Sequence, residues 1–276
     1  MTKKEDIIIM NFSGIYKQQQ FWQTGEIQRN ISWVEVQELP GSNCYCDGDA
    51  METLRQKLEE FDADGIHFID SGNYHYMTRI WMDKAKNPFS LLVFDNHTDM
   101  QPPAFGGLLS CGGWIADALE SVELLDHVFL VGPDQSAFHQ VQQVYKERVT
   151  FFSREDLQAA RQTNSSSGVA ASFLEMLSEY EKKTGKFSPV YLSVDKDVLN
   201  EQEVKTTWSQ GDMSLTELKS CLEELQSFLK ARKLPLQAAD VCGEWEPENG
   251  GAGSPAGHDH ANHELLEVLK GFDYEE

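Results

Sequence analysis

The segment Leu91-Leu92-Val93-Phe94-Asp95-Asn96-His97-Thr98-Asp99 decides the fold of this chain. Its apolar half predicts a buried strand, and two carboxylates and an imidazole follow directly. A second segment of the same kind is Val190-Tyr191-Leu192-Ser193-Val194-Asp195-Lys196-Asp197. In open α/β sheets, ligands bind at the carboxyl ends of the strands. The two segments therefore predict strands that carry carboxylates to one edge of a sheet, where so much negative charge needs a cation.

Short apolar runs alternate with helical stretches along the rest of the sequence. The other expected strands are 7–12, 65–70, 128–132, 149–152 and 238–242. The expected helices are 49–61, 114–125, 136–147, 168–183, 214–229 and 263–269, and Ser214 with Glu217 forms the pattern of a capping box. This alternation predicts an α/β fold, a three-layer sandwich around a mostly parallel, doubly wound sheet. We expect residues 1–276 to form a single domain.

Composition narrows the classes of partner. The 276 residues are 40% hydrophobic and carry a formal net charge of −22. Such acidity argues against nucleic acid and against an anionic membrane surface, because both require Lys and Arg. The first apolar run, residues 7–10, is too short for a signal peptide, and the odd number of cysteines, 5, argues against a disulfide framework. We therefore expect a cytoplasmic protein, with a homo-oligomer left open.

The two polar segments offer a specific set of metal ligands. Residues at i, i+2 and i+4 of an extended segment share a face, which groups Asp95, His97 and Asp99, and likewise Asp195 with Asp197. Four carboxylates and an imidazole exceed the needs of one tetrahedral site and suit two adjacent divalent cations. Such donors favour Mn²⁺, with Zn²⁺, Fe²⁺ or Co²⁺ as alternatives. Two metals about 3.5 Å apart can hold a hydroxide ready to attack an electrophilic carbon.

These residues carry a family resemblance from about residue 65 to the C-terminus. The segments 95–99 and 193–197 resemble the Asp-Ala-His-x-Asp and Ser-x-Asp-x-Asp signatures of the ureohydrolases, the arginase and agmatinase family. Gly72-Asn73-Tyr74-His75-Tyr76 stands where that family has Gly-Gly-Asp-His-Ser, and it keeps the histidine. Glu244-Trp245-Glu246-Pro247 is a partial counterpart of the family's Glu-Val-Asn-Pro element. The chain thus resembles a divergent ureohydrolase with an arginase-like fold.

The resemblance implies roles for particular residues. It places one metal on His75, Asp95, Asp99 and Asp195, and the other on Asp95, His97, Asp195 and Asp197, with Asp95 and Asp195 as bridges. As catalytic residues, Asp99 would hydrogen-bond the attacking hydroxide and Glu244 would pair with the guanidinium of the substrate. The implied reaction is hydrolysis of a guanidinium C–N bond, with loss of an amine and release of urea.

The chain departs from the family pattern where a proton shuttle is expected. The family has a His-Gly element soon after its first signature, and here the stretch 110–114 contains no histidine. We expect Cys111 to be a pocket wall, and the candidates for a shuttle are His258, His260 and His263. The loops 101–113 and 246–261 are rich in Gly and Pro and are expected to be walls or lids of a pocket.

The sequence does not determine the substrate, and it is compatible with two other functions. Residues 132–136 replace the family's arginine-reading loop, so a small guanidino molecule other than free L-arginine, or arginine within a peptide, fits as well. One alternative is a histone-deacetylase-like enzyme, which uses one zinc ion, although Asp99 and Asp197 favour two metals. The other is a non-catalytic binding protein on the same fold, because the shuttle histidine is absent.

Overall fold

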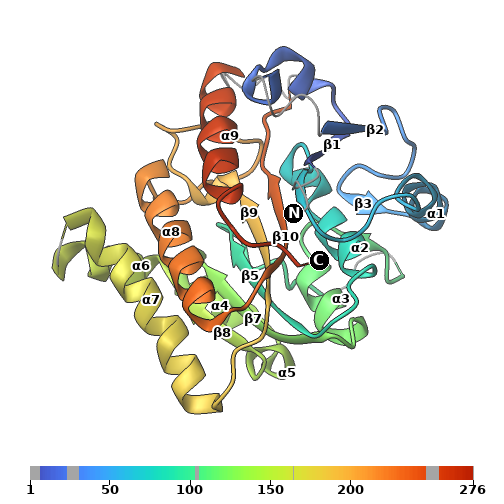
Figure 1. Ribbon diagram of the computed structural model, residues 1–276. Helices are drawn as coiled ribbons and strands as arrows, with labels where there is room; N and C mark the ends of the chain where they lie inside the picture. Colours follow the sequence, from blue (N-terminus) through green and yellow to red (C-terminus); the bar gives the residue numbers. More distant parts are fainter. Residues whose placement is uncertain (1–6, 24–30, 103–105, 164, 247–254, 276) are drawn as a thin grey trace.

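The computed structural model describes residues 7–23, 31–102, 106–163, 165–246 and 255–275 (Figure 1). In this part of the chain, eight strands pair in parallel in the order β2-β1-β4-β10-β9-β5-β7-β8. Their bounds are β1 (Ile7–Asn11), β2 (Ile31–Glu35), β4 (Ile66–Phe68), β5 (Phe89–Phe94), β7 (Leu125–Val131), β8 (Val149–Phe152), β9 (Val190–Asp195) and β10 (Leu236–Cys242). A small antiparallel pair, β3 (Tyr45–Cys46) and β6 (Leu109–Ser110), lies apart from this sheet.

Helices cover both faces of the sheet, which makes three layers (Figure 1). One face packs against α6 (Arg154–Thr163), α7 (Ser165–Thr184), α8 (Leu215–Arg232) and α9 (Pro255–Leu269). The other packs against α1 (Gly48–Lys57), α2 (Met77–Met82), α3 (Trp114–Ser121), α4 (Gln135–Gln140) and α5 (Gln143–Lys146). This arrangement has the three layers and the parallel sheet that the sequence predicts.

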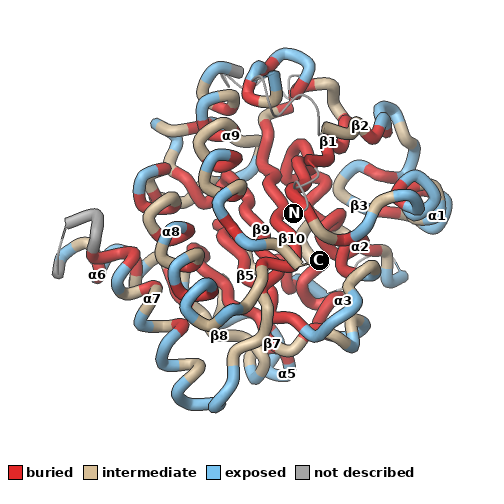
Figure 2. Tube along the Cα trace, viewed as in Figure 1, coloured by how far each residue is buried: buried red, intermediate tan, exposed pale blue. Residues whose placement is uncertain are grey.

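The central strands are buried along their whole length (Figure 2). Successive side chains of β5 alternate between the two layers, so that Leu92 packs toward α7 and α8 while Leu91 packs toward α2 and α3. Parallel strands covered on both faces need apolar residues at nearly every position, which is why these strands show no hydrophobic alternation. Because β5, β9 and β10 are parallel neighbours, their carboxyl ends lie together at one edge.

The structure differs from the expected elements in several places. The sequence does not predict five of the observed elements, which are the strands β2, β3 and β6 and the helices α2 and α6. The helix expected at 114–125 ends at Ser121, since Leu125 already begins β7. The helix expected at 136–147 is two helices, α4 and α5, separated by the extended residues Val141 and Gln142. The helix α9 begins at Pro255, so the expectation of a loop to residue 261 was wrong there, and residues 247–254 lie outside the described residues.

Two further features follow from the described helices. The capping box of α8 is confirmed: Ser214 Oγ accepts a hydrogen bond from Glu217 N at 3.2 Å, and Glu217 Oε2 accepts one from Ser214 N at 2.9 Å. Among the described residues, no helix combines the length and the apolar character that crossing a membrane would require.

We expect Ser214→Ala to lower the free energy of unfolding by about 1 kcal/mol, because an alanine leaves the amide of Glu217 without its cap. The measurement is urea unfolding followed by circular dichroism. Ser227→Ala is the matched control, since this exposed serine of the same helix bonds only the carbonyl of Glu223. Equal losses in the two variants would show that the cap contributes nothing.

Candidate metal centre

One carboxylate stands at the end of each of two neighbouring strands. Asp195 is the last residue of β9 and Asp95 follows the last residue of β5, and both are buried. The imidazole of His75 meets both of them from the turn before α2. Its Nδ1 lies 3.3 Å from Asp95 Oδ2, 3.2 Å from Asp99 Oδ2 and 3.5 Å from Asp195 Oδ2. Thus one ring nitrogen faces three carboxylates.

A second imidazole faces the same carboxylate from its other side. His97 Nδ1 lies 2.8 Å from Asp197 Oδ2 and 3.4 Å from Asp95 Oδ1. Asp95 therefore directs one oxygen toward His75 and the other toward His97. A carboxylate placed in this way would be able to contact a cation with either oxygen. The structure thus brings together all six predicted metal ligands, His75, Asp95, His97, Asp99, Asp195 and Asp197.

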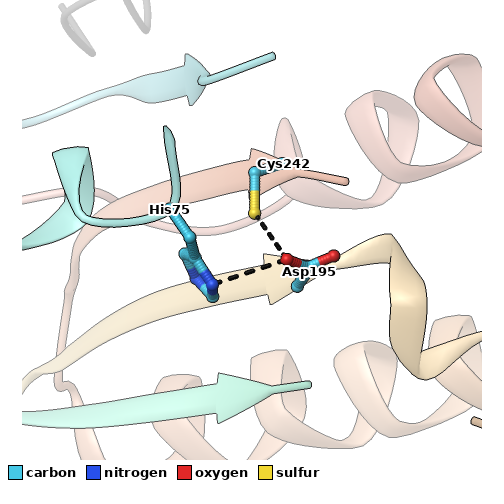
Figure 3. Close-up of side chains that lie close together, drawn as sticks. All are labelled: His75, Asp195 and Cys242. Atoms are coloured by element: carbon cyan, nitrogen blue, oxygen red, sulfur yellow. Dashed lines mark hydrogen bonds and ion pairs between the residues drawn. The ribbon is translucent and has the colours of Figure 1, made fainter. Parts of the chain in front are cut away.

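Cys242 joins this cluster, although no sequence motif marks it as a ligand. It is the last residue of β10 and is paired in register with Asp195, the last residue of β9. Its Sγ lies 3.2 Å from Asp195 Oδ2 and donates a hydrogen bond to it (Figure 3). The signal that could have found it is its position at the carboxyl end of an expected strand.

Two glycines allow the chain to approach the cluster closely. Gly243 has a φ of +87°, and a Cβ there would come within 2.7 Å of Lys196 N. A Cβ on Gly72 would lie 3.1 Å from Asp195 Oδ2. The Cβ at position 243 would also overlap Asp195 Oδ1, and that at position 72 would press on the other oxygen, so glycine at both sites leaves room for the carboxylate.

Asp99 is held in an unusual conformation. Its φ of +46° lies in the left-handed region, which a non-glycine residue rarely adopts. The indole Nε1 of Trp114, the first residue of α3, donates a hydrogen bond of 2.6 Å to Asp99 Oδ2. The same indole lies 4.7 Å from the ring of His75, measured between centroids. One tryptophan thus positions both a carboxylate and an imidazole of the cluster.

The electrostatics of the cluster show an excess of negative charge. Burial, together with the charge of Asp95, raises the pKa of Asp99 to about 6, and burial and neighbouring carboxylates also raise the pKa values of Asp195 and Asp197. Burial opposes a charge on His97, but Asp197 and Asp95 raise its pKa to about 12. Four carboxylates thus share two imidazoles, and a cation would relieve their repulsion.

The donor set fits divalent cations. Asp95 Oδ2 is buried and has no hydrogen-bond partner, although it lies within the cluster. Buried polar atoms are almost always paired, so an unpaired carboxylate oxygen indicates a missing partner. Oxygen and imidazole donors suit Mn²⁺, Zn²⁺, Fe²⁺ and Co²⁺. We conclude that these residues are able to hold such ions.

A cavity of about 240 Å³ opens above the cluster. Its floor is formed by the carboxylates Asp95, Asp99, Asp195 and Asp197 and by His97. Its walls are formed by Cys44, Tyr45, Gly72, Gln101, Ser110, Cys111, Gly112 and Trp208. The wall role expected for Cys111 and for the described part of the loop 101–113 agrees with this arrangement. No Lys or Arg is among these lining residues, so the cavity favours cationic groups.

Glu244 lies in a separate polar cluster and not in the cavity wall. Its carboxylate is fully buried: Oε1 accepts hydrogen bonds from Lys196 Nζ and Asn262 Nδ2, and Oε2 accepts one from Gln19 Nε2. Burial alone would raise the pKa of Glu244, but Lys196 and His258 hold it below its ordinary value. Both oxygens of Glu244 already have partners within the chain, and Glu244 is not among the residues that line the cavity, so the contact with a guanidinium that the resemblance implies stays a prediction.

The candidate shuttle histidines also lie away from the cavity. His258 is buried, with Nε2 2.9 Å from the carbonyl oxygen of Lys205 and Nδ1 3.2 Å from Lys196 Nζ. His260 is exposed and His263 is partly exposed on α9, and neither lines the cavity. None of the three therefore has the position of a proton shuttle in this structure.

Comparisons with known proteins agree with this geometry. The model of the arginase family matches residues 27–248. An uncharacterized protein of Thermotoga maritima is 29% identical over 249 residues, which are 87% of this chain and 80% of that protein. Formimidoylglutamase from Bacillus subtilis superposes with a TM-score of 0.69 at 14% identity, covering 98% of this chain and 88% of that chain.

Two further structures show the same fold. Proclavaminate amidino hydrolase from Streptomyces clavuligerus has a TM-score of 0.66 at 15% identity, covering 98% of this chain and 91% of that chain. Arginase from Entamoeba histolytica, solved with L-ornithine, has a TM-score of 0.65 at 14% identity, covering 98% of this chain and 99% of that chain. Identities this low establish the fold alone, and they confirm the arginase-like sandwich expected from the sequence.

We expect Trp114→Phe to weaken the binding of divalent metal by about 10- to 100-fold, because Asp99 loses the donor that orients it. Isothermal titration with Mn²⁺ measures the change. Trp81→Phe is the matched control: Trp81 is equally buried and stacks on His67 at 4.0 Å, but its Nε1 has no hydrogen-bond partner. Unchanged affinity in Trp114→Phe would contradict the positioning role.

We expect Glu244→Gln to lower the free energy of unfolding by about 3–5 kcal/mol, because it leaves Lys196 as a buried charge without its counter-ion. The double variant Lys196→Met/Glu244→Gln should recover most of that loss in urea unfolding. Glu267→Gln, which removes the partly exposed partner of Lys270, serves as a control with little effect. A double variant no more stable than Glu244→Gln would contradict the coupling.

Proposed function

We propose that this chain, which belongs to the arginase family, is a hydrolase that uses two divalent cations to cleave a C–N bond of a guanidino or amidino group. The observation that carries the proposal is the Asp95 carboxylate, with one oxygen toward His75 and the other toward His97. A single-metal site would not need a carboxylate turned toward two separate imidazoles. The four carboxylates of the cavity floor support the same interpretation.

The ligands divide into two sets around Asp95 and Asp195. One cation would be held by His75, Asp95, Asp99 and Asp195, and the other by Asp95, His97, Asp195 and Asp197. Judged by these nitrogen and oxygen donors alone, Mn²⁺ is the first candidate, with Zn²⁺, Fe²⁺ or Co²⁺ as alternatives. Such a pair of ions, when bound, lowers the pKa of water and polarises the group under attack.

The residues of the chain supply orientation and proton transfer. Asp99 lines the cavity, and Trp114 fixes one of its oxygens. It is the residue that we assign to hydrogen-bond the attacking water and to accept its proton. Trp208, with 42% of its surface exposed, lines the cavity and offers an aromatic face to a planar cationic group. Its indole Nε1 donates to Asn73 Oδ1 at 2.9 Å, which sets the direction of the ring.

The charges of the cavity bear on the substrate. Two bound divalent cations would neutralise the four carboxylates of the floor, but the α-carboxylate of free arginine would still find no Lys or Arg among the lining residues. We therefore favour a guanidino or amidino compound without a neighbouring carboxylate, or arginine within a peptide. The cytoplasm is the proposed compartment, since all five cysteines are free thiols.

We expect the Mn²⁺-loaded protein to contain two metal ions per chain and to release urea from a guanidino compound, or formamide or ammonia from a formimino compound, for at least one member of a panel of both kinds. Asp99→Asn should lower kcat by about 10²- to 10⁴-fold, because it removes the proton acceptor. Elemental analysis and colorimetric product assays measure both quantities. Asp62→Asn, an exposed carboxylate paired with Lys86, is the control and should leave turnover unchanged.

The alternatives give different results in the same experiment. One zinc ion per chain, with release of acetate from acetylated lysine, would favour a deacetylase. Two metal ions without turnover of any compound would favour a binding protein. Either outcome would contradict the proposed hydrolase.

A further inference from the structure

We propose that the thiol of Cys242 is a ligand of the cation on the His75 side, which makes this position selective for Zn²⁺, Co²⁺ or Fe²⁺ over Mn²⁺. The proposal rests on the metal centre of the proposed function and adds a donor to it. Its starting point is geometric: one donor atom each of His75, Asp195 and Cys242 lies within 4.8 Å of the others. Figure 3 shows the three side chains converging from the turn before α2 and from the ends of β9 and β10.

The surroundings of Cys242 set it apart from the other buried cysteines. Cys221 lies on α8 within one hydrophobic core layer, while Cys46 and Cys242 both belong to the other, so burial alone does not distinguish Cys242. Buried cysteines of this kind behave as small apolar residues. The thiol of Cys242 instead contacts Asp195 Oδ2 at 3.2 Å, and this oxygen is 3.5 Å from His75 Nδ1. Among the described cysteines, only Cys242 belongs to a group able to hold a metal ion.

A hydrogen bond alone does not account for this placement. A thiol is a weak donor, and a buried carboxylate gains more from an amide or hydroxyl donor. The imidazole of His75 also faces Asp95 Oδ2 at 3.3 Å from its Nδ1, and this buried oxygen has no hydrogen-bond partner. All three side chains of the group are buried, with residue exposures of 1% for His75, 3% for Asp195 and 1% for Cys242. A cation held by His75, Asp195 and Cys242 would give the thiol a stronger partner than a hydrogen bond to Asp195.

The consequence is a centre with two unlike positions. The His75 side would offer nitrogen, oxygen and sulfur donors, whereas the His97 side offers only nitrogen and oxygen. Soft thiolate ligands select Zn²⁺, Fe²⁺ and Co²⁺ over Mn²⁺. On binding, the S–H bond breaks, a sulfur–metal bond forms and the proton passes to solvent. Loading of this position should therefore release one more proton than loading without the thiol.

The test is a titration of the metal-free protein with Co²⁺, followed by absorption in the near-ultraviolet, where thiolate-to-cobalt charge transfer is seen. Cys44→Ser/Cys111→Ser is the background, because both thiols line the cavity. We expect the charge-transfer band in this background and its loss when Cys242→Ser is added. The Kd for Zn²⁺ should rise by at least about 10-fold in Cys242→Ser, and the Kd for Mn²⁺ should change less.

Controls keep this test separate from that of the proposed function. Cys221→Ser, which removes a buried thiol of the core, should keep the band, and circular dichroism of Cys242→Ser and Cys242→Ala reports their folding. Two bound Co²⁺ ions without the band, or a band that survives Cys242→Ser, would overturn the thiol ligand and leave the hydrolase intact. Absence of any Co²⁺ or Mn²⁺ binding would overturn both. The chemical shift of bound ¹¹³Cd in the unsubstituted protein gives an independent measure of sulfur ligation.

Discussion

The structure depends on the meeting of two carboxylates at the ends of β5 and β9. Two unit charges 4 Å apart interact by about 4 kcal/mol in a medium with an effective dielectric constant of 20, so such a meeting is costly when both groups are buried. The chain offsets part of this cost with its own donors. The backbone amides of Asn96, His97 and Asp197 donate to the cluster, and so does the indole of Trp114. The remainder requires positive charge, which the imidazoles supply only in part.

A second polar layer lies beneath this centre. Lys196 stands between the ligands Asp195 and Asp197, but its side chain takes the opposite direction and pairs with Glu244. Asn262 of α9 and Gln19, which follows the short helix Ile15–Gln18, complete the contacts of that carboxylate. A buried ion pair contributes little net stability, but it fixes geometry because any other arrangement leaves a charge unpaired. The pair therefore ties the end of β10 and α9 to the backbone of the metal ligands.

Much of the sheet and most of the metal ligands could be predicted from the sequence, for a physical reason. Fully buried parallel strands appear as uninterrupted apolar runs, and the ligands at 95–99 and 195–197 follow such runs directly. The sequence does not predict strand β2, because this strand lies at the edge of the sheet, is only half buried and therefore has no apolar run. The helix α9 began earlier than expected because glycines and a proline suggest a loop, while packing of residues such as Ala261 against the sheet stabilises the helix.

The site residues show where sequence reasoning ends. His75 was placed through a family motif, and the structure sets it against the carboxylates, since a short turn brings it over the strand ends. For Glu244 the motif suggested a substrate contact, but no local pattern could reveal that Lys196, far along the chain, occupies its oxygen. For Cys242 the converse holds: no motif marks it, and only the register of β10 with β9 places it beside Asp195. Pairings between distant segments are decided by tertiary packing, which a pattern of neighbouring residues does not contain.

The same charges that hold metal also shape what enters the cavity. In the metal-free protein its floor carries four carboxylates and its described walls carry no cationic side chain, so a ligand's positive end is attracted and a negative end is repelled. Discrimination of this kind needs no dedicated pocket, because an unpaired carboxylate brought into such a cavity loses its hydration without gaining a partner. Two bound divalent cations would offset the four negative charges of the floor, but they would leave the described walls without a cationic partner for a carboxylate. A substrate with its guanidino or amidino group at the floor and a neutral group at the walls therefore fits the metal-loaded cavity. Because Glu244 pairs with Lys196 and does not line the cavity, recognition is left to the floor and to the ring of Trp208.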